Sequence, residues 1–302
     1  MKDTSENISR LKRIFDDTDN ILIGAGAGLS TASGIEYSGR RFEDNFRDFI
    51  KKYDFTDMYT SGFYPFETEE EKWAYWSKHI YLNNVGMSAT PLYEKIHELV
   101  KDKNYFVITT NVDDQFYKAS FDSDRIFRMQ GSYRYIQCQK ACHDKLYDNT
   151  QLVKQMIDSI DDDLRIASEL VPKCPVCGGP MDTNLRKDNY FVEDEYWHAQ
   201  KNAYVNYLNS VKNENTLLLE FGVGFNTPSI IRFPFEEMAF NNDKWTLARI
   251  NKDHLELMVK LKYNYKLLTV EDLDEMGLKS IFLDRYIPLN DDVELVIDEL
   301  LK

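Results

Sequence analysis

Four cysteines have the spacing of a metal site. Cys138 and Cys142 are separated by three residues, Cys174 and Cys177 by two, and 31 residues lie between the pairs. Two such pairs can bring four thiolates together around Zn²⁺ in tetrahedral geometry. Because sulfur then fills all four positions, no place is left for a water molecule, and we expect the metal to stabilise the fold and not to perform chemistry. His143 is the nearby competitor as a ligand.

A glycine-rich turn follows the first apolar run of the chain. Ile21–Ile23 predicts a buried parallel strand, and three glycines make the turn after it: Gly24, Gly26 and Gly28. Glycines allow positive φ and let the backbone approach an anion closely. Three hydroxyls can cap the following turn and donate to phosphate oxygens: Ser30, Thr31 and Ser33. Because position 29 is leucine, the spacing is not the GxGxxG fingerprint, and the turn alone fits either a bound nucleotide or a structural role.

Polar residues follow another apolar run. Tyr105–Thr110 predicts a strand, and Asn111 and Asp113 come directly after it. Polar side chains at the carboxyl end of a parallel strand project into the crevice where ligands bind. These two residues are therefore candidates for catalysis, with an Asn/Asp turn as the structural alternative.

Strands alternating with helices must position these residues. Strands are also predicted at Thr216–Phe221, Leu247–Asn251 and Ser280–Leu283, and helices at Ile8–Asp17, Pro91–Lys101, Tyr196–Leu208 and Asp291–Leu301. Thr90 is the expected cap of the helix that begins at Pro91. This order predicts an α/β fold, a Rossmann-like parallel sheet with helices on both faces.

The segment Phe46–Trp76 is rich in aromatic residues. We interpret it as a helical module whose rings form a small core. The alternative is that some of the rings line an apolar channel for a long acyl or lipoyl chain.

Composition limits the class of protein. At 302 residues the chain can bury a substantial core, in one large domain or two unequal ones. A net charge of −14 without a cluster of Lys and Arg disfavours nucleic acid as a partner. The first residues lack the apolar centre of a signal peptide, and no run approaches the roughly 18 apolar residues of a membrane span. We therefore expect a cytoplasmic protein with no membrane partner, a location that suits metal-bound cysteines.

The ten residues Gly26–Ile35, GAGLSTASGI, resemble the signature of the sirtuins, which are NAD-consuming enzymes. TNVD at 110–113, the paired cysteines and the dipeptide IN at 250–251 match the same family in the same order. The resemblance implies that NAD is a substrate and that the cysteines hold the zinc of a zinc ribbon. It also implies that Asp284, Arg285 and Tyr286 border the adenine, and that NAD is bound by Gly26, Ala27, Gly28, Ser30, Ile35, Gly222, Gly224 and Asn251.

The resemblance also suggests how the chain divides into domains. Residues 1–40, 86–133 and 215–302 would form the NAD-binding domain. The helical module at 41–85 and the zinc-ribbon module at 134–214 would together form a smaller domain.

In the same way, the resemblance gives roles to the residues that follow two strands. Asn111 would orient the ribose or a water beside it, and Asp113 would accept a hydrogen bond from the nicotinamide amide. Sirtuins carry His-Gly-Ser where this chain has Gln130, Gly131 and Ser132. The histidine is the general base of the family, and glutamine has no proton equilibrium near neutral pH. Gln130 can position the ribose but cannot be the base, so deacylation should be weak or absent.

The loop after Ile35 differs from the family pattern Pro-Asp-Phe-Arg, because Glu36 to Gly39 stand there instead. We expect Tyr37 or Phe42 to supply the aromatic wall beside the ribose, and Arg40 or Arg41 to supply the cation beside the phosphates.

Transfer of ADP-ribose to an anionic nucleophile needs no base, because Asp and Glu are ionised at neutral pH. The chain is similar to macrodomain-linked microbial sirtuins, which carry the same change of His to Gln and modify a lipoylated carrier protein related to the glycine-cleavage H protein. We therefore expect an NAD-dependent protein mono-ADP-ribosyltransferase, with such a carrier as acceptor and a macrodomain hydrolase as functional partner. The alternatives are a weak NAD-dependent deacylase, an NAD hydrolase and a non-catalytic NAD-binding protein.

Overall fold

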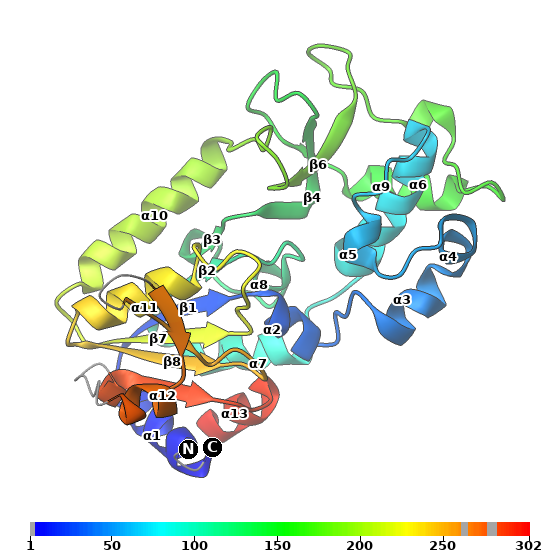
Figure 1. Ribbon diagram of the computed structural model, residues 1–302. Helices are drawn as coiled ribbons and strands as arrows, with labels where there is room; N and C mark the ends of the chain where they lie inside the picture. The colour runs from blue at the N-terminus through cyan, green and yellow to red at the C-terminus, as the bar shows by residue number, and fades with distance from the viewer. Residues whose placement is uncertain (1–3, 261–264, 277–282) are drawn as a thin grey trace.

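A six-stranded sheet forms the centre of the molecule. The computed structural model describes residues 4–260, 265–276 and 283–302. The strand order is β11-β8-β7-β1-β2-β3 (Figure 1). The strands are β1 (Asn20–Ala25), β2 (Asn104–Thr109), β3 (Ile126–Arg128), β7 (Thr216–Phe221), β8 (Trp245–Ile250) and β11 (Tyr286–Leu289). Every pairing in this sheet is parallel, which confirms the predicted α/β class.

The strand order reverses at β1. From β1 the chain runs outward through β2 and β3 on one side, and later through β7, β8 and β11 on the other. Gly24 of β1 pairs in register with Ile108 of β2 and Glu220 of β7, so the carboxyl ends of these three strands lie side by side. Open α/β sheets bind ligands outside the carboxyl ends of their strands at such a reversal. The glycine turn and the residues after β2 therefore meet at one edge.

Helices cover both faces of this sheet. In β1, Ile21 and Ile23 belong to one hydrophobic core and Leu22 to another, as the alternation of a strand requires. The first core is closed by α1 (Thr4–Asp16), α2 (Ala27–Ala32), α7 (Pro91–Val100), α8 (Gln115–Lys118) and α13 (Val293–Leu300). The second is closed by α10 (Glu195–Val211), α11 (Arg232–Asn241) and α12 (Val270–Glu275).

The aromatic helices and the cysteine-bearing strands share a third core. Its helices are α3 (Gly39–Asn45), α4 (Arg47–Tyr53), α5 (Met58–Ser61), α6 (Glu69–Ile80) and α9 (Thr150–Ser159), with a π-helical turn at Tyr81–Val85. Its antiparallel sheet has the order β5 (Tyr147–Asp148), β4 (Gly131–Cys138), β6 (Met181–Leu185). The Tyr75 ring centroid lies 5.5, 5.8 and 5.6 Å from those of Phe46, Phe49 and Phe55. The predicted aromatic core is confirmed, and it lies above the large sheet in Figure 1.

Local sequence explains where two helices begin. The Thr68 hydroxyl accepts a hydrogen bond from the backbone N–H of Glu71 at 3.2 Å and so caps α6. Pro91 lies in the first turn of α7, where a backbone N–H is not needed. Thr90 is at the predicted cap position, but its hydroxyl makes no capping bond. Its backbone N–H donates to Gln115 Oε1 at 2.9 Å, which ties the start of α7 to the segment after β2.

The last strand of the sheet is not where the sequence predicted it. Residues 280–282 of the predicted strand lie outside the described residues, and Leu283 begins a 3₁₀ turn. The strand β11 starts at Tyr286, whose hydroxyl donates to Leu255 O at 2.5 Å. Because β11 runs parallel to β8, Asp284 and Arg285 lie at the end of the sheet away from the crevice. The expectation that they border the adenine is therefore wrong.

Helix α10 packs on the large sheet. Trp197 and Tyr207 lie in the same core as Phe106 of β2 and Phe127 of β3, and the ring centroids of Phe127 and Trp197 are 5.1 Å apart. The expected zinc-ribbon module at 134–214 included this helix. The packing instead groups residues 195–211 with the parallel sheet, because the aromatic face of α10 covers β2 and β3.

A short antiparallel pair, β9 (Leu257–Lys260) and β10 (Tyr265–Leu268), completes the strands that the structure describes. Across the described ranges, no helix combines the length and the apolar character that crossing a membrane requires.

Candidate active site

The glycine turn and the end of β7 are in backbone contact. Gly26 N–H donates to Phe221 O at 3.0 Å, and Gly28 N–H donates to Gly222 O at 2.9 Å. Gly222 has a φ of +57°, and a Cβ added there would lie 2.3 Å from the backbone nitrogen of Leu29. The glycines with positive φ do not include Gly24, Gly26 and Gly28, so the turn itself makes no use of that conformational freedom. At Gly26 and Gly28 the missing side chain permits close approach to Gly222.

Asn111 lies against this turn. Its side-chain nitrogen donates to Gly26 O at 3.0 Å and to the Tyr93 hydroxyl at 3.2 Å. A backbone carbonyl can only accept, so the contact with Gly26 fixes which end of the amide is nitrogen. Both amide hydrogens are then used, and Asn111 presents its carbonyl oxygen as an acceptor.

Asp113 is buried beside the same tyrosine. The Ser30 hydroxyl donates to Asp113 Oδ2 at 2.5 Å and lies 3.3 Å from the Tyr93 hydroxyl. The backbone N–H of Gln115 donates to Asp113 Oδ1 at 3.0 Å. Burial raises the pKa of the Asp113 carboxyl, and the hydrogen bonds from Ser30 and Gln115 oppose that rise. The structure thus joins Ser30, Asn111 and Asp113 in one cluster through Tyr93.

The hydroxyls after the glycine turn do not cap the helix α2. Gly26 precedes this helix and has no side chain to cap it. Thr31 donates to Ala27 O at 3.1 Å, and Ser33 donates to Ser30 O at 2.7 Å. The predicted capping is wrong, because each hydroxyl has an acceptor within reach in its own turn or, for Ser30, in Asp113. At the two ends of this segment, Ala27 is exposed and Ile35 is buried.

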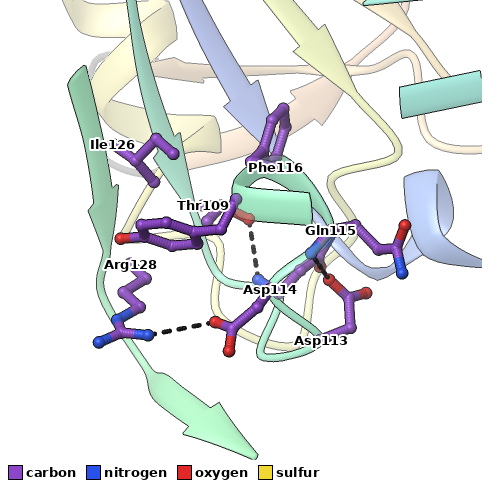
Figure 2. A pocket seen from close by; sticks show the side chains of 9 residues that line it. Thr109, Asp113, Asp114, Gln115, Phe116, Ile126 and Arg128 are labelled. Carbon is purple, nitrogen blue, oxygen red and sulfur yellow. Dashed lines mark hydrogen bonds and ion pairs between the residues drawn. The ribbon is translucent and has the colours of Figure 1, made fainter. Parts of the chain in front are cut away.

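A small cavity lies beside the cluster (Figure 2), lined by Thr109, Asn111, Asp113, Asp114, Gln115, Phe116, Tyr117, Ile126 and Arg128. Arg128 Nη1 lies 3.2 Å from Asp114 Oδ1, and the Ser132 hydroxyl donates to Asp114 Oδ2 at 2.6 Å. The Arg128 guanidinium also lies 4.9 Å from the ring centroid of Tyr135. Arg128 and Ser132 flank Gln130 in the sequence. The Asp114 carboxylate therefore holds both sides of the turn that carries Gln130.

Gln130 stands on that turn, half-buried, after β3. Its backbone oxygen accepts from Arg186 N–H at 3.1 Å. The next residue, Gly131, has a φ of +89°, and a Cβ there would lie 2.0 Å from Asn184 O. Only glycine fits this position, so the backbone that orients Gln130 is fixed by its neighbour.

In and after the loop that follows Ile35, the two candidate aromatic rings and the two candidate arginines differ in exposure and in contacts. Phe42 is 1% exposed and packs in the aromatic core, which leaves Tyr37 as the half-exposed ring. Arg41 donates to Glu36 O in the loop itself, and to Leu82 O and Asn83 Oδ1 in the small module. Arg40 is 93% exposed and pairs with Asp44 at 3.3 Å.

His79 is the centre of a buried chain of hydrogen bonds. Its Nδ1 lies 3.2 Å from the Tyr75 hydroxyl, and its Nε2 lies 2.9 Å from the Tyr133 hydroxyl. The Tyr133 hydroxyl is 2.8 Å from that of Tyr37. Burial, followed by the positive charge of Arg41, lowers the pKa of His79 to about 3. The imidazole is therefore neutral throughout the physiological range.

This shift predicts a pH dependence of stability. The unfolded chain protonates His79 below about pH 6.5, whereas the native state resists protonation down to about 3. Stability is therefore lost as the pH falls from about 6.5 towards about 3. Between about pH 7.5 and about pH 5, we expect the free energy of unfolding to fall by about 2 kcal/mol more in the wild type than in His79→Gln.

Urea unfolding of both proteins at each pH measures this difference. His198→Gln is the matched control, because that side chain is 55% exposed on α10, and it should keep the wild-type slope. Equal slopes for wild type and His79→Gln would contradict the assignment.

Gly224 and Asn251, two more of the residues expected to bind NAD, lie in the loops after β7 and β8. Asn251 Nδ2 donates to Val223 O at 3.0 Å, which joins the two loops. Arg232 also connects these two loops, because it donates to Val223 O at 3.3 Å and to His254 O at 2.8 Å. Gly224 faces open space, since no heavy atom lies within 4 Å of a Cβ added there.

A buried ion pair supports these loops. Arg249 Nε lies 2.6 Å from Glu220 Oε1, with both side chains 0% exposed, and Arg249 Nη2 lies 2.7 Å from Glu236 Oε1. Glu220→Gln leaves one carboxylate for a guanidinium that water cannot reach. We expect it to lower the free energy of unfolding by about 2 to 3 kcal/mol, because removing one partner leaves a buried charge poorly compensated.

The matched control is Glu98→Gln. Glu98 pairs with Lys101 at 2.8 Å but is 60% exposed, so its loss should cost less than about 0.5 kcal/mol. Urea unfolding gives both values. If both variants lower the free energy of unfolding by less than about 0.5 kcal/mol, the buried ion pair does not stabilise the fold.

The four cysteines fit a zinc ion. Their sulfurs lie within 4.8 Å of one another. Cys138 Sγ is 3.7 Å from Cys177 Sγ, and Cys142 Sγ is 3.6 Å from Cys174 Sγ. Four sulfurs at about 2.3 Å from a tetrahedral Zn²⁺ are about 3.8 Å apart, whereas a disulfide needs about 2 Å. His143 Nδ1 lies 3.1 Å from Cys142 Sγ, while its Nε2 lies 2.9 Å from the Tyr147 hydroxyl.

Sequence reasoning missed Tyr93, Gln115 and the chain through Tyr133. Tyr93 stands between apolar residues on the buried face of α7, so its position indicates packing only. Gln115 is fully buried, which no neighbouring residue type signals. Their roles arise from contacts between segments distant in the sequence.

Comparison with known proteins identifies the family of this chain. A family model described as the Sir2 family matches residues 26–212. A protein ADP-ribosyltransferase of Staphylococcus aureus is 36% identical over 253 residues, which cover 83% of this chain and 80% of that protein. A probable bifunctional ADP-ribose hydrolase/ADP-ribosyltransferase of Fusarium oxysporum f. sp. cubense is 30% identical over 78% of this chain, but only 41% of that protein is covered.

Solved structures show the same fold. The structure of Sir2Tm bound to a propionylated peptide matches with a TM-score of 0.56 at 15% identity, covering 100% of this chain and 98% of that one. A Sir2 homologue in complex with NAD matches with a TM-score of 0.54 at 15% identity, covering 97% and 92%. With the matched family model, these likenesses show that the chain belongs to the Sir2 family, the NAD-consuming enzymes that its glycine segment indicated.

Proposed function

We propose that this chain transfers a single ADP-ribose unit from NAD to a protein acceptor and releases nicotinamide. The observation that carries the proposal is Gln130, an amide at the turn where the family has its general base. Two relatives in the comparison are named as ADP-ribosyltransferases, which supports the same reaction here.

The chemistry needs no proton acceptor. The bond between C1′ of the ribose and the nicotinamide nitrogen breaks, and its electron pair leaves with neutral nicotinamide. The ribose carbon gains positive character, and a lone pair of an acceptor carboxylate forms the new C–O bond. An Asp or Glu acceptor is already ionised at neutral pH. Deacylation instead requires deprotonation of a ribose hydroxyl, which an amide cannot perform.

The chain's own residues would orient the reactants. Asn111 presents a carbonyl oxygen that can accept from a ribose hydroxyl, and Gln130 holds the ribose from the neighbouring strand end. Asp113, with Ser30 donating to it, would accept from the nicotinamide amide. His79 does not replace the missing base, because both of its ring nitrogens are hydrogen-bonded to tyrosines.

The acceptor we propose is a lipoylated carrier protein related to the glycine-cleavage H protein. A macrodomain hydrolase that removes ADP-ribose is the proposed functional partner. The Fusarium relative is named as a probable bifunctional ADP-ribose hydrolase and ADP-ribosyltransferase, which supports this pairing.

Intact-protein mass spectrometry tests the proposal. The purified chain is incubated with NAD and the carrier, with and without lipoylation, and in parallel with acyl-lysine peptides. We expect added ADP-ribose mass on the lipoylated carrier, less on the bare carrier, and no deacylation of the peptides. Gln130→Ala should lose the transfer, and Asn202→Ala, on the exposed side of α10, should keep it. Nicotinamide release without a modified acceptor would indicate a hydrolase, and efficient peptide deacylation would overturn the proposal.

A further inference from the structure

Four hydrogen-bonded side chains connect the small module to the edge of the proposed NAD site. The Tyr75 hydroxyl donates to Met58 O at 2.5 Å. His79 lies next, with Nδ1 at 3.2 Å from Tyr75 and Nε2 at 2.9 Å from Tyr133, and the Tyr133 hydroxyl lies 2.8 Å from that of Tyr37. Tyr75, His79 and Tyr133 are each less than 5% exposed, whereas Tyr37 is half-exposed.

The donor and the acceptor of every hydrogen bond between these four side chains follow from the buried end of the series, at Tyr75. A backbone carbonyl can only accept, so the Tyr75 proton points to Met58. His79 Nδ1 must then carry a hydrogen and donate to the Tyr75 oxygen. The imidazole is neutral, so its Nε2 is bare and accepts from Tyr133.

The same logic reaches Tyr37. Because the Tyr133 proton is given to His79, the Tyr133 oxygen accepts from the Tyr37 hydroxyl. Tyr37 has only one hydrogen, and it is now used. Tyr37 therefore has oxygen lone pairs to offer a ligand, and no donor.

We propose that Tyr37 accepts a hydrogen bond from a hydroxyl of the nicotinamide-side ribose, and that Tyr133, His79 and Tyr75 are positioning residues that set this polarity. The inference rests on the use of NAD proposed above. It goes beyond an aromatic wall, because it concerns the hydroxyl and not the ring face. It also excludes Tyr37 as a general base, since its oxygen keeps its own proton.

Two observations place Tyr37 near Asp113, at the end of the site where we expect nicotinamide to leave. It lies two residues after Ile35, whose N–H donates to Ser30 O at 2.9 Å, and Ser30 contacts Asp113. Burial raises the pKa of both Tyr37 and Tyr133, and the negative charge of Asp113 adds to both shifts. A ribose beside Asn111 would then meet two acceptors, the Asn111 oxygen and the Tyr37 oxygen, for its two hydroxyls.

Binding measurements with modified NAD test the contact. Affinities of NAD and of its 2′-deoxy and 3′-deoxy nicotinamide-ribose analogues are measured by calorimetry without acceptor protein. Tyr37→Phe is expected to weaken NAD binding by about three- to tenfold, the range of one hydrogen bond. It should leave the affinity for one of the two deoxy analogues at its wild-type value. Tyr59→Phe, on an exposed ring of α5, is the matched control and should change nothing.

The polarity is tested with analogues that carry fluorine in place of the same hydroxyl, because fluorine cannot donate. The wild type should bind the fluoro analogue at least about threefold more weakly than NAD. Tyr133→Phe frees the Tyr37 proton, so this discrimination should shrink. A role in folding alone would weaken all ligands equally.

The outcomes are distinct from those of the transferase test. If wild type binds NAD and both deoxy analogues with equal affinity, the inference is overturned even where ADP-ribose transfer is intact. If Tyr37→Phe loses affinity for NAD and for both deoxy analogues alike, the contact is also refuted. Hydroxyl-dependent binding through Tyr37, with no transfer to any acceptor, would leave this inference standing and remove the proposed function. Thermal unfolding shows whether each variant is folded. If a variant is not folded, the affinities of the wild type for NAD and its analogues test the proposed contact instead.

Discussion

Cys174→Ser is expected to abolish zinc binding and to unfold the β5-β4-β6 module. Cys174 and Cys138 are 2% and 1% exposed, and both belong to the core that includes the aromatic helices. A structural zinc ion contributes on the order of 10 kcal/mol in small zinc modules, far more than one packed side chain. Loss of one thiolate leaves three ligands and an open position, so most of that free energy is lost. We expect no bound zinc and a lower urea midpoint.

Metal analysis and urea unfolding measure the effect, and His143→Ala is the control. His143 lies beside Cys142, but the four sulfurs alone complete a tetrahedral site, so this variant should keep one zinc per chain. The transition of the wild type should shift in the same direction when a strong chelator is added, and return with added zinc. A Cys174→Ser protein with full zinc and an unchanged midpoint would show that the cluster is not a zinc site.

The sequence predicted the features that depend on local pattern. Thr216–Phe221 is apolar except for Thr216 and Glu220, and it forms β7 with the predicted limits. The paired cysteines meet because each pair lies close together in sequence and β4 pairs with β6, so Cys138 is opposite Met181. In both cases the signal is contained in a few neighbouring residues.

Features that depend on contacts between distant segments could not be predicted. The glycine with positive φ at this edge is Gly222, which follows a strand nearly 200 residues after the glycine turn. The turn and β7 become neighbours only when the sheet reverses at β1, and no local pattern around Gly26 indicates which strand will lie beside it. The same is true of Tyr93, which contacts Asn111 across the crevice edge.

The error at the end of the chain has a different cause. Tyr286–Leu289 contains Pro288, which lacks the N–H that a central strand needs, and this weakens the strand pattern. Pro288 is tolerated because β11 is the edge of the sheet and pairs with β8 only. Arg285 was read as a residue facing the nucleotide, but its guanidinium donates to three backbone carbonyls: Ala239 O, Asn242 O and Trp245 O.

The cluster at the strand ends is built to hold groups in place. Asn111 and Tyr37 have used their hydrogens on protein partners, and each presents an oxygen. Gln130 adds an amide that cannot titrate. We expect such a site to align a ribose and support loss of nicotinamide, whereas its two amides cannot take a proton from the ribose.

Asn111→Ala is expected to lower the rate of ADP-ribosyl transfer by about 10³-fold, or about 4 kcal/mol, with a smaller effect on NAD affinity. The amide is fixed by Gly26 and Tyr93 before substrate arrives, so its oxygen needs no reorganisation to meet the ribose. Loss of one preorganised group of this kind typically costs 10² to 10³ in rate. Asn111→Asp should not rescue activity, because a carboxylate cannot donate to Gly26 O.

Nicotinamide release and acceptor modification should be followed together, since both depend on the same C1′–N cleavage. Asn202→Ala, an exposed substitution of the same type on α10, should retain the wild-type rate. Binding of NAD by Asn111→Ala within about tenfold of wild type would place the loss in the transition state and not in substrate capture. If Asn111→Ala turns over within threefold of wild type, the strand-end amide is not part of the reaction, and the assignment of this edge of the sheet as the catalytic centre fails with it.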